Sequence, residues 1–406
     1  MKILIDIWFK CIKIYSGDNM IFYKNAKVIF PDKIRDCVVA VNNGKIADIC
    51  ESFEKNESDT VIDCKGSYLA PGFIDIHVHG GGNKSAMSEH PSDIIEMAES
   101  HLEYGTTSIA PTTLAAPVEQ LKKVVSSIKK AAEESKNANI IGVHLEGPYI
   151  SMQYKGAQSP ENILNPLKDS PDELFDIWNK ILIMGAAPEC EGVLELGDKL
   201  KERGIVASIA HSAASYEQVE AAINHGFSDV THIYNACSSC FKTGLFRKAG
   251  VVEAGLCKDE LTTQTIADLR HLPKGLLELI YKCKGDEKMY LITDGLEFSA
   301  SDIKENTVYT QENGIGVIYE DKVMKLADRS ALAGSVATLS DCVRNMYKCI
   351  GVPLYSAVKM ASLTPANVCG YGDRKGKIQK GYDADLIMLD DEINVKSVMT
   401  NGNIIY

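Results

Sequence analysis

The sequence predicts an α/β protein built on a closed (β/α)8 barrel of the TIM type, with a small β-domain made from both chain ends. Three observations lead to this prediction. Eight short apolar, strand-like runs alternate with helical stretches in the middle of the chain. Histidines and carboxylates recur where those runs end, which is the face at which such barrels build their sites. Strand-and-turn patterns occupy both ends of the chain.

Composition and charge limit the classes of function. The chain has 406 residues, of which 45% are hydrophobic and 24% charged, as in ordinary globular proteins. The formal net charge of -12 disfavours nucleic acid as a partner. The apolar run at residues 3–9 is interrupted by a charge and is too short to span a bilayer, so no membrane association is predicted. Residues 1–19 are interpreted as an N-terminal extension.

The twelve cysteines are scattered and predict a reduced, cytoplasmic protein, because a chain of this length does not need disulfide bonds to form a stable core. Cys237 and Cys240 have the spacing of a zinc-binding pair. No second pair of this kind occurs in the sequence, so a structural zinc ribbon is not expected.

Residues 20–69 and 371–406 are predicted to form the small β-domain. The first segment contains short apolar runs, and Asn43-Gly44 is a strong signal for a hairpin turn. The second segment repeats the pattern, with Asn401-Gly402 near its end. Because chain termini often lie close together, we expect the two segments to pair.

Residues 70–370 are predicted to form the barrel. An open doubly wound sheet is the alternative, but it would need a G-x-G-x-x-G loop after its first strand, and Gly80-Gly81-Gly82-Asn83 lacks that spacing. Between the strands, residues 118–134 and 216–225 are the clearest helices. The eight predicted strands are 73–80, 107–113, 140–147, 181–187, 206–211, 229–234, 262–267 and 289–294.

The first barrel strand ends in His77-Val78-His79. Side chains alternate along a strand, so the two histidines should point the same way and can bind one metal ion. A hydrogen-bonded pair of histidines in a polar core is the alternative. Asp75 shares their face by parity and is predicted to orient a ligand histidine.

Four later strands end in further potential ligands, namely Glu146, His211, His232 and Asp294. Each has an alternative explanation that needs no metal. Glu146 could form a salt bridge, His211 and His232 could be hydrogen-bonded histidines at strand ends, and Asp294 could cap the following turn. Ionisable side chains at buried strand ends are costly unless they are paired or bound to metal, and their repetition favours a metal centre. The set can hold one or two divalent ions, and the sequence does not choose among zinc, iron and manganese.

Residues after the sixth and seventh strands could contact a substrate. Arg247 and His271 beside a metal pocket would suit a phosphate group, since guanidinium binds phosphate oxygens in a bidentate fork. A surface arginine is at least as consistent with the spacing. Gly334 could bring backbone amides close to a ligand.

From about residue 21 to the C-terminus, an ordered set of motifs resembles the N-acetylglucosamine-6-phosphate deacetylases of the amidohydrolase superfamily. The motifs are Leu69-Ala70-Pro71-Gly72-Phe73-Ile74-Asp75, His144-Leu145-Glu146-Gly147-Pro148, Lys155-Gly156-Ala157-Gln158, Ala187-Pro188-Glu189, Ala210-His211-Ser212, Thr231-His232-Ile233-Tyr234-Asn235-Ala236, Thr293-Asp294-Gly295 and Leu332-Ala333-Gly334-Ser335.

The resemblance implies a metal-dependent barrel with a small β-sandwich domain, a homodimer, and hydrolysis of N-acetylglucosamine 6-phosphate to glucosamine 6-phosphate and acetate in amino-sugar catabolism. It implies that Glu146, His211 and His232 hold the principal metal and that His77 and His79 add a second site. Asp294 would be the catalytic acid/base. The sugar phosphate would be held by Asn235, the backbone amide of Ala236, Arg247 and His271.

The segment 237–246 departs from the family, because it is longer than the usual connection. Deacetylation of N-acetylgalactosamine 6-phosphate or of an unphosphorylated sugar is therefore an alternative. A catalytically inactive sugar-phosphate binder is another, although no ligand is missing. Dihydroorotase- or hydantoinase-type enzymes commonly use a carboxylated lysine where this chain has Glu146, which argues against them.

Overall fold

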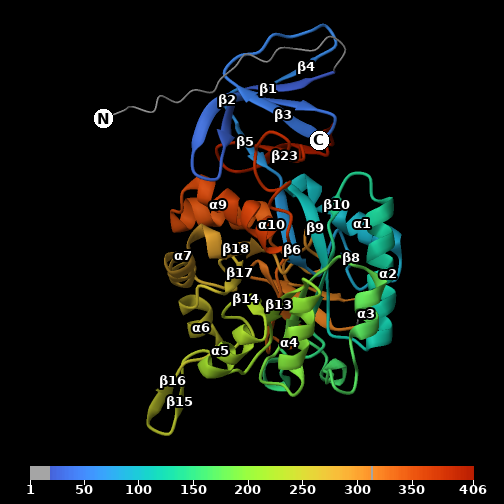
Figure 1. Cartoon of the computed structure of the whole chain (residues 1–406), viewed down its shortest axis with the longest axis vertical. Helices are drawn as coiled ribbons and strands as arrows, with labels where there is room; N and C mark the ends of the chain where they lie inside the picture. Colours follow the sequence, from blue (N-terminus) through green and yellow to red (C-terminus); the bar gives the residue numbers. More distant parts are fainter. Residues whose placement is uncertain (1–18, 312–313) are drawn as a thin grey trace.

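The computed structural model describes residues 19–311 and 314–406; residues 1–18 of the predicted extension lie outside them. Two bodies are visible in Figure 1, a barrel of strands surrounded by helices and a sheet-rich domain at one end of it. The predicted α/β barrel with a separate β-rich domain is confirmed.

The barrel strands are parallel, and neighbours in the sheet are mostly consecutive in the chain. β6 pairs with β9 at one edge, and the barrel closes where the amide of Asp294, just after β18, donates to the carbonyl of His77 at 2.9 Å. The strands are β6 (Phe73–Val78), β9 (Thr106–Thr113), β10 (Asn139–Ile140), β11 (Val143–Glu146), β12 (Ile181–Ala186), β13 (Val206–Ile209), β14 (Phe227–Val230), β17 (Thr262–Ile266) and β18 (Met289–Ile292).

The third predicted strand is divided into β10 and β11, which both pair with β9. Gly142 lies between them, where the backbone approaches β12. A Cβ atom at this position would lie 2.5 Å from the carbonyl oxygen of Lys180. A glycine is therefore required, and the ladder is interrupted there.

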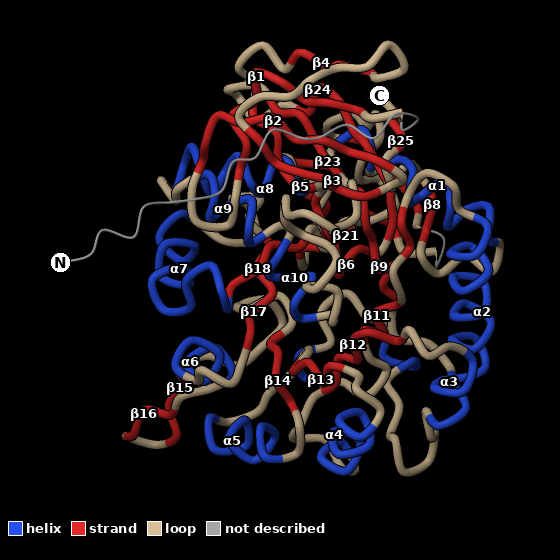
Figure 2. Tube along the Cα trace, turned by 45° about the horizontal axis from the view of Figure 1, so that its top comes forward, coloured by secondary structure: helices blue, strands red, loops and turns tan. Residues whose placement is uncertain are grey.

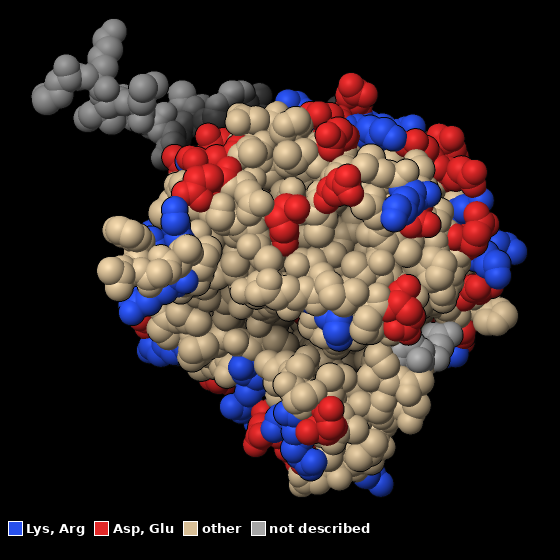
Figure 3. Space-filling view, turned by 90° about the horizontal axis from the view of Figure 1, so that it is seen from below, with Lys and Arg blue, Asp and Glu red and all other residues tan. Residues whose placement is uncertain are grey.

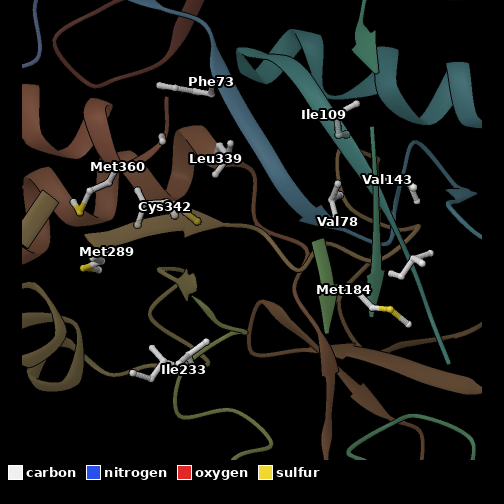
Figure 4. Packing of buried hydrophobic residues seen from close by; sticks show 14 of the residues in the cluster. Phe73, Val78, Ile109, Val143, Met184, Ile233, Met289, Leu339, Cys342 and Met360 are labelled. Carbon is white, nitrogen blue, oxygen red and sulfur yellow. The ribbon is translucent and has the colours of Figure 1, made fainter. Parts of the chain in front are cut away.

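Helices cover the outside of the barrel (Figure 2). The largest hydrophobic cluster fills the layer between strands and helices; in Figure 4 Met289 of β18 lies in this layer with Leu339 and Cys342 of α8 and Met360 of α9. The helices are α1 (Pro91–Ser100), α2 (Val118–Glu134), α3 (Asp172–Ile177), α4 (Val193–Glu202), α5 (Tyr216–Asn224), α6 (Val251–Cys257), α7 (Lys274–Lys288), α8 (Leu339–Arg344), α9 (Leu354–Met360) and α10 (Leu363–Val368).

Strands from both chain ends form one hydrogen-bonded sheet of eight strands. β5 joins the two ends, since it runs parallel to β1 on one side and antiparallel to β23 on the other. The strands are β1 (Ile21–Ile29), β2 (Ile34–Asn42), β3 (Lys45–Cys50), β4 (Thr60–Asp63), β5 (Tyr68–Pro71), β23 (Leu386–Leu389), β24 (Val395–Thr400) and β25 (Asn403–Ile404).

Three small sheets were not predicted from the sequence. A four-stranded antiparallel sheet lies between β18 and α8, and two hairpins follow the first and sixth barrel strands. The hairpin of β15 and β16 projects from the body of the molecule (Figure 1). The strands are β7 (Gly80–Gly81), β8 (Lys84–Ser85), β15 (Phe241–Thr243), β16 (Phe246–Lys248), β19 (Thr307–Thr310), β20 (Gly316–Glu320), β21 (Val323–Leu326) and β22 (Leu332–Gly334).

The direction of the barrel places its carboxyl face away from the end sheet. β5 of that sheet leads directly into the amino end of β6, and the other barrel strands run parallel to β6. The view from below in Figure 3 shows a hollow in the middle of this face, bordered mainly by uncharged side chains. Within residues 19–311 and 314–406, no helix has the length and apolar character needed to cross a bilayer.

Candidate metal centre and active-site pocket

Four buried histidines meet at the carboxyl face with their rings held in the same way. Each Nδ1 atom faces an oxygen atom, so each Nε2 atom is left to point into the centre. The Nδ1 contacts are His79 with the carbonyl oxygen of Thr112 at 3.1 Å, His211 with that of Tyr154 at 2.8 Å, His232 with that of Asn235 at 3.0 Å, and His77 with Oε1 of Gln264 at 2.6 Å.

Glu146 lies between the two pairs of histidines. Its Oε1 atom is 3.3 Å from Nε2 of His211 and 3.0 Å from Nε2 of His232. Its Oε2 atom is 3.4 Å from Nε2 of His79 and accepts a hydrogen bond from Nε2 of Gln158 at 2.8 Å. One carboxylate thus faces both pairs, as a bridging ligand does.

The spacing of these atoms fits metal coordination. Within each pair, His77 with His79 and His211 with His232, the Nε2 atoms are 3.2 Å apart. A tetrahedral ion with metal–nitrogen bonds of about 2.0–2.1 Å places its ligand atoms about 3.3 Å apart. Among residues 19–311 and 314–406, two trios satisfy this condition and share Glu146: one with His77 and His79, the other with His211 and His232. The donors are imidazole and carboxylate, which suit zinc, iron and manganese.

The protein without metal holds charge at this centre. Burial raises the pKa of Glu146, but the facing His211 and His77 outweigh burial and hold that pKa well below its ordinary value. Burial lowers the pKa of His79, but hydrogen bonds to Asp294 and Glu146 raise it to about 10. A metal ion must therefore displace a proton from His79, and we expect metal affinity to fall as the pH is lowered.

Asp294 lies beside the His77/His79 trio. Its Oδ1 atom is 3.2 Å from Nε2 of His79 and 3.5 Å from Nε2 of His77. Burial raises the pKa of Asp294, but the hydrogen bond from His79 and the charge of His77 lower it to about 2. Asp294 is therefore a carboxylate near neutral pH and can accept a proton.

The backbone is strained where several of these side chains are presented. His211, His232 and Asp294 have φ angles of 46°, 27° and 50°, which non-glycine residues rarely adopt. Such conformations cost of order 1–3 kcal/mol each and persist only where the surroundings impose them. Each of the three follows the end of a barrel strand, so the strain turns the side chain into the centre.

A cavity of about 440 Å³ opens beside the centre. Asn235, Ala236, His271 and Gly334 line it together with Glu146 and Asp294. Gly334 has a φ of 131°, and a Cβ atom there would lie 2.8 Å from the Leu296 side chain. Any side chain at position 334 would therefore collide with Leu296 in the wall of the cavity. A second cavity of about 580 Å³ adjoins the first at His79 and Gln158.

His271 is paired within the first cavity. Its Nδ1 atom is 2.7 Å from Oδ2 of Asp268. Burial lowers the pKa of His271, but the hydrogen bond and charge of Asp268 outweigh burial and raise it above its ordinary value. The pair can therefore present a cationic ring to an anionic ligand.

Two predicted residues are placed differently. Arg247 does not line either cavity; it lies exposed on β16, opposite Lys242 of β15, because the segment after Ala236 forms a projecting hairpin. Asp75 was predicted to orient a ligand histidine ring. It contacts the backbone of His77 instead of a ring: it accepts from the backbone amide of His77 at 3.3 Å, and it also accepts from the hydroxyl of Thr293 at 2.5 Å.

Two glutamines that the sequence did not single out contact the centre. Gln158 holds Glu146, and Gln264 holds His77. Gln158 belongs to one of the motifs that carry the family resemblance, and that motif could have indicated a residue of the site. Gln264 is a polar residue at an inner position of a buried strand, which is unusual and could have been noted.

Comparison with known proteins agrees with this geometry. Residues 68–405 match the model of the amidohydrolase family. The chain is 32% identical to an N-acetylglucosamine-6-phosphate deacetylase of Bacillus subtilis (strain 168), across 96% of this chain and 98% of that protein. The crystal structure of the same enzyme from Pasteurella multocida has a TM-score of 0.88 and 29% identity, covering 95% of this chain and 99% of that one. The enzyme from Thermotoga maritima has a TM-score of 0.82 and 30% identity, with coverages of 95% and 99%.

Proposed function

This chain belongs to the amidohydrolase family and, within it, to the N-acetylglucosamine-6-phosphate deacetylases, and on that premise we propose that it hydrolyses the acetamide of N-acetylglucosamine 6-phosphate. The products are acetate and glucosamine 6-phosphate, which places the reaction in amino-sugar catabolism. The observation that carries the proposal is the pair of ligand trios sharing Glu146, with Asp294 beside them at the wall of the 440 Å³ cavity.

The roles of the residues follow from their positions. Glu146, His211 and His232 would hold one divalent ion, and His77, His79 and Glu146 a second. When bound, such ions supply an acidified water and polarise the amide carbonyl. Asp294, ionised and lining the cavity, accepts the proton that the attacking water loses and returns it to the departing amine nitrogen. His271, Asn235 and the Ala236 amide would hold the sugar phosphate.

A substrate panel tests the proposal. Purified protein loaded with Zn²⁺, Fe²⁺ or Mn²⁺ is incubated with N-acetylglucosamine 6-phosphate, the galacto epimer, free N-acetylglucosamine and a cyclic amide, and acetate and free amine are measured. Release of acetate mainly from the gluco phosphate supports the proposal. Hydrolysis of the cyclic amide instead would overturn it, and binding of the sugar without turnover would indicate an inactive homologue.

The pH dependence of substrate binding should report on His271. Because the pKa of His271 is raised, its cation is present below that pKa and is lost as the pH rises through it. A hydrogen bond to a charged group is worth about 1.5–3 kcal/mol, so KM for the phosphorylated sugar should increase about ten- to hundredfold across this transition. In His271→Gln the increase should disappear. An equal increase for free N-acetylglucosamine would contradict the role.

We also propose a cytoplasmic homodimer, and the β15–β16 hairpin supports the dimer. Its tip carries the exposed apolar residues Leu245 and Phe246, which are 92% and 74% exposed. Exposed apolar groups that cluster mark interaction sites. Arg247 follows directly on the same hairpin and lines neither cavity of its own chain, so we propose that it serves as a phosphate ligand in the cavity of a second subunit.

Two substitutions separate assembly from binding. Phe246→Ser should shift the protein toward monomer in sedimentation experiments and raise KM. Arg247→Ala should leave the dimer intact and raise KM for the phosphorylated substrate about ten- to hundredfold. Mixing Arg247→Ala with Glu146→Ala subunits should recover activity, because hybrid dimers contain one complete site. A monomeric wild-type enzyme with full activity would rule out this arrangement.

A further inference from the structure

One of the four histidine rings is held by a side-chain amide, whose oxygen and nitrogen can exchange places by rotation. Among the described residues, His79, His211 and His232 direct Nδ1 at backbone carbonyl oxygens, which can only accept a hydrogen bond. The Nδ1 atom of His77 faces the side-chain amide of Gln264. An amide presents an acceptor on one side and a donor on the other, so Gln264 alone does not fix the tautomer of His77.

The orientation of Gln264 is fixed by Asp229. Nε2 of Gln264 lies 2.8 Å from Oδ2 of Asp229. An ionised carboxylate only accepts hydrogen bonds, so the NH2 group of Gln264 must face Asp229 and its oxygen must face His77. The neutral imidazole of His77, the form that binds metal, must then carry its proton on Nδ1, and its Nε2 lone pair points toward Glu146 and Asp294.

The other polar neighbours of Asp229 donate hydrogen bonds to its carboxylate. Oδ2 also accepts from the hydroxyls of Ser208 at 2.7 Å and Tyr290 at 3.0 Å, and Oδ1 accepts from Thr262 at 2.6 Å. Asp229, Gln264 and His77 are completely buried, so water does not compete for these bonds. Burial raises the pKa of Asp229, and the hydrogen bonds from its four donors oppose that rise. Because all four donors converge on the carboxylate, its oxygens act as acceptors, including toward Gln264.

We propose that Asp229 is a positioning residue that acts through Gln264 to select the tautomer of His77 able to bind metal. We call the hydrogen-bonded contacts Asp229–Gln264–His77 the tautomer lock, because they fix which nitrogen of His77 carries the proton. It rests on the proposed metal site of His77 and His79, but not on the identity of the substrate. The tautomer lock has the role that was predicted for Asp75 from the sequence, which is to orient a ligand histidine.

The test removes the lock without removing a ligand. Asp229→Asn is nearly isosteric, but its amide can donate to Gln264 and so permits the amide of Gln264 to turn its NH2 group toward His77. Outer partners of metal-binding histidines typically contribute 10- to 100-fold in affinity. We therefore expect the second of two Zn²⁺ ions, measured by titration against a chelating indicator, to bind about 10- to 100-fold more weakly. The ion at Glu146, His211 and His232 should be retained.

A charge exchange should restore the lock. In the double variant Asp229→Asn with Gln264→Glu, residue 264 can only accept, so it takes the proton of His77 Nδ1 on one oxygen and the amide of residue 229 on the other. Recovery of the second ion in the double variant would not follow from a merely structural role. Tyr290→Phe is the matched control, since it removes one donor to Asp229 without freeing Gln264, and it should bind both ions.

The outcomes are distinguishable. Two ions bound with wild-type affinity by both the Asp229→Asn and the Gln264→Met proteins would overturn the proposal, as would a double variant no better than a weakened single one. If Asp229→Asn does not fold, Gln264→Met, which keeps the side-chain length and offers no amide group, should show the same loss of the second ion. Metal titration needs no sugar, so a failure of the deacetylase assay leaves this test unaffected.

Discussion

Replacing Glu146 by glutamine should abolish both metal sites and with them the deacetylase activity. Glu146 is the residue shared by the two ligand trios: its Oε1 atom lies 3.0 Å from Nε2 of His232, and its Oε2 atom lies 3.4 Å from Nε2 of His79. Glutamine keeps the shape but offers one neutral oxygen, so it cannot bridge two cations. Because metal ions are worth several kcal/mol in such reactions, kcat/KM should fall by more than about a thousandfold.

Metal content and thermal stability measure this loss separately from catalysis. The wild-type protein should gain in Tm when metal is added, since an ion that binds only the folded state stabilises it. Glu146→Gln should show neither bound metal nor the gain in Tm. Glu161→Gln is the matched control, because it makes the same change of charge at an exposed position on the rim of the neighbouring cavity. Full activity and metal content in Glu146→Gln would refute the bridging role.

The barrel and the candidate ligands of this centre were predictable because local patterns encode them. Strand ends in a parallel barrel share one face, so a histidine or carboxylate after each apolar run had to converge with the others. His77, Glu146, His211, His232 and Asp294 lie together for that reason, although the sequence contains no direct information on the strained φ angles that turn three of them inward.

Contacts between side chains distant in sequence were not predictable in the same way. Gln264 meets His77 across 187 positions, and no pattern within a strand indicates which ring an amide faces. Arg247 was expected beside His271 because it follows the sixth predicted strand, but its position in the sequence does not reveal a hairpin that carries it away from the cavity. The sheet of β19 to β22 falls in a stretch with only weak alternation, and its strands are stabilised by packing on Leu296 and Phe298.

Asp294→Asn should separate proton transfer from metal binding. Asparagine has the same shape but cannot accept the proton of the attacking water or return one to the amine. General acid–base catalysis contributes about 10²- to 10⁴-fold, and kcat should fall by that factor. KM should change little, because the proposed phosphate ligands are His271 and its neighbours and not Asp294.

The metal content of the Asp294→Asn variant decides between the two roles that the geometry permits. Asp294 lies 3.2 Å from Nε2 of His79, close enough to be a ligand as well as a base. If the variant retains both ions and loses kcat, Asp294 acts mainly on protons. If it loses an ion, Asp294 is needed as a ligand, and the fall in kcat no longer measures proton transfer. A kcat within tenfold of the wild-type value would exclude Asp294 as the acid/base. Among the described residues, Glu146 is the one other carboxylate that contacts both His77 and His79, and it would then be the candidate for proton transfer.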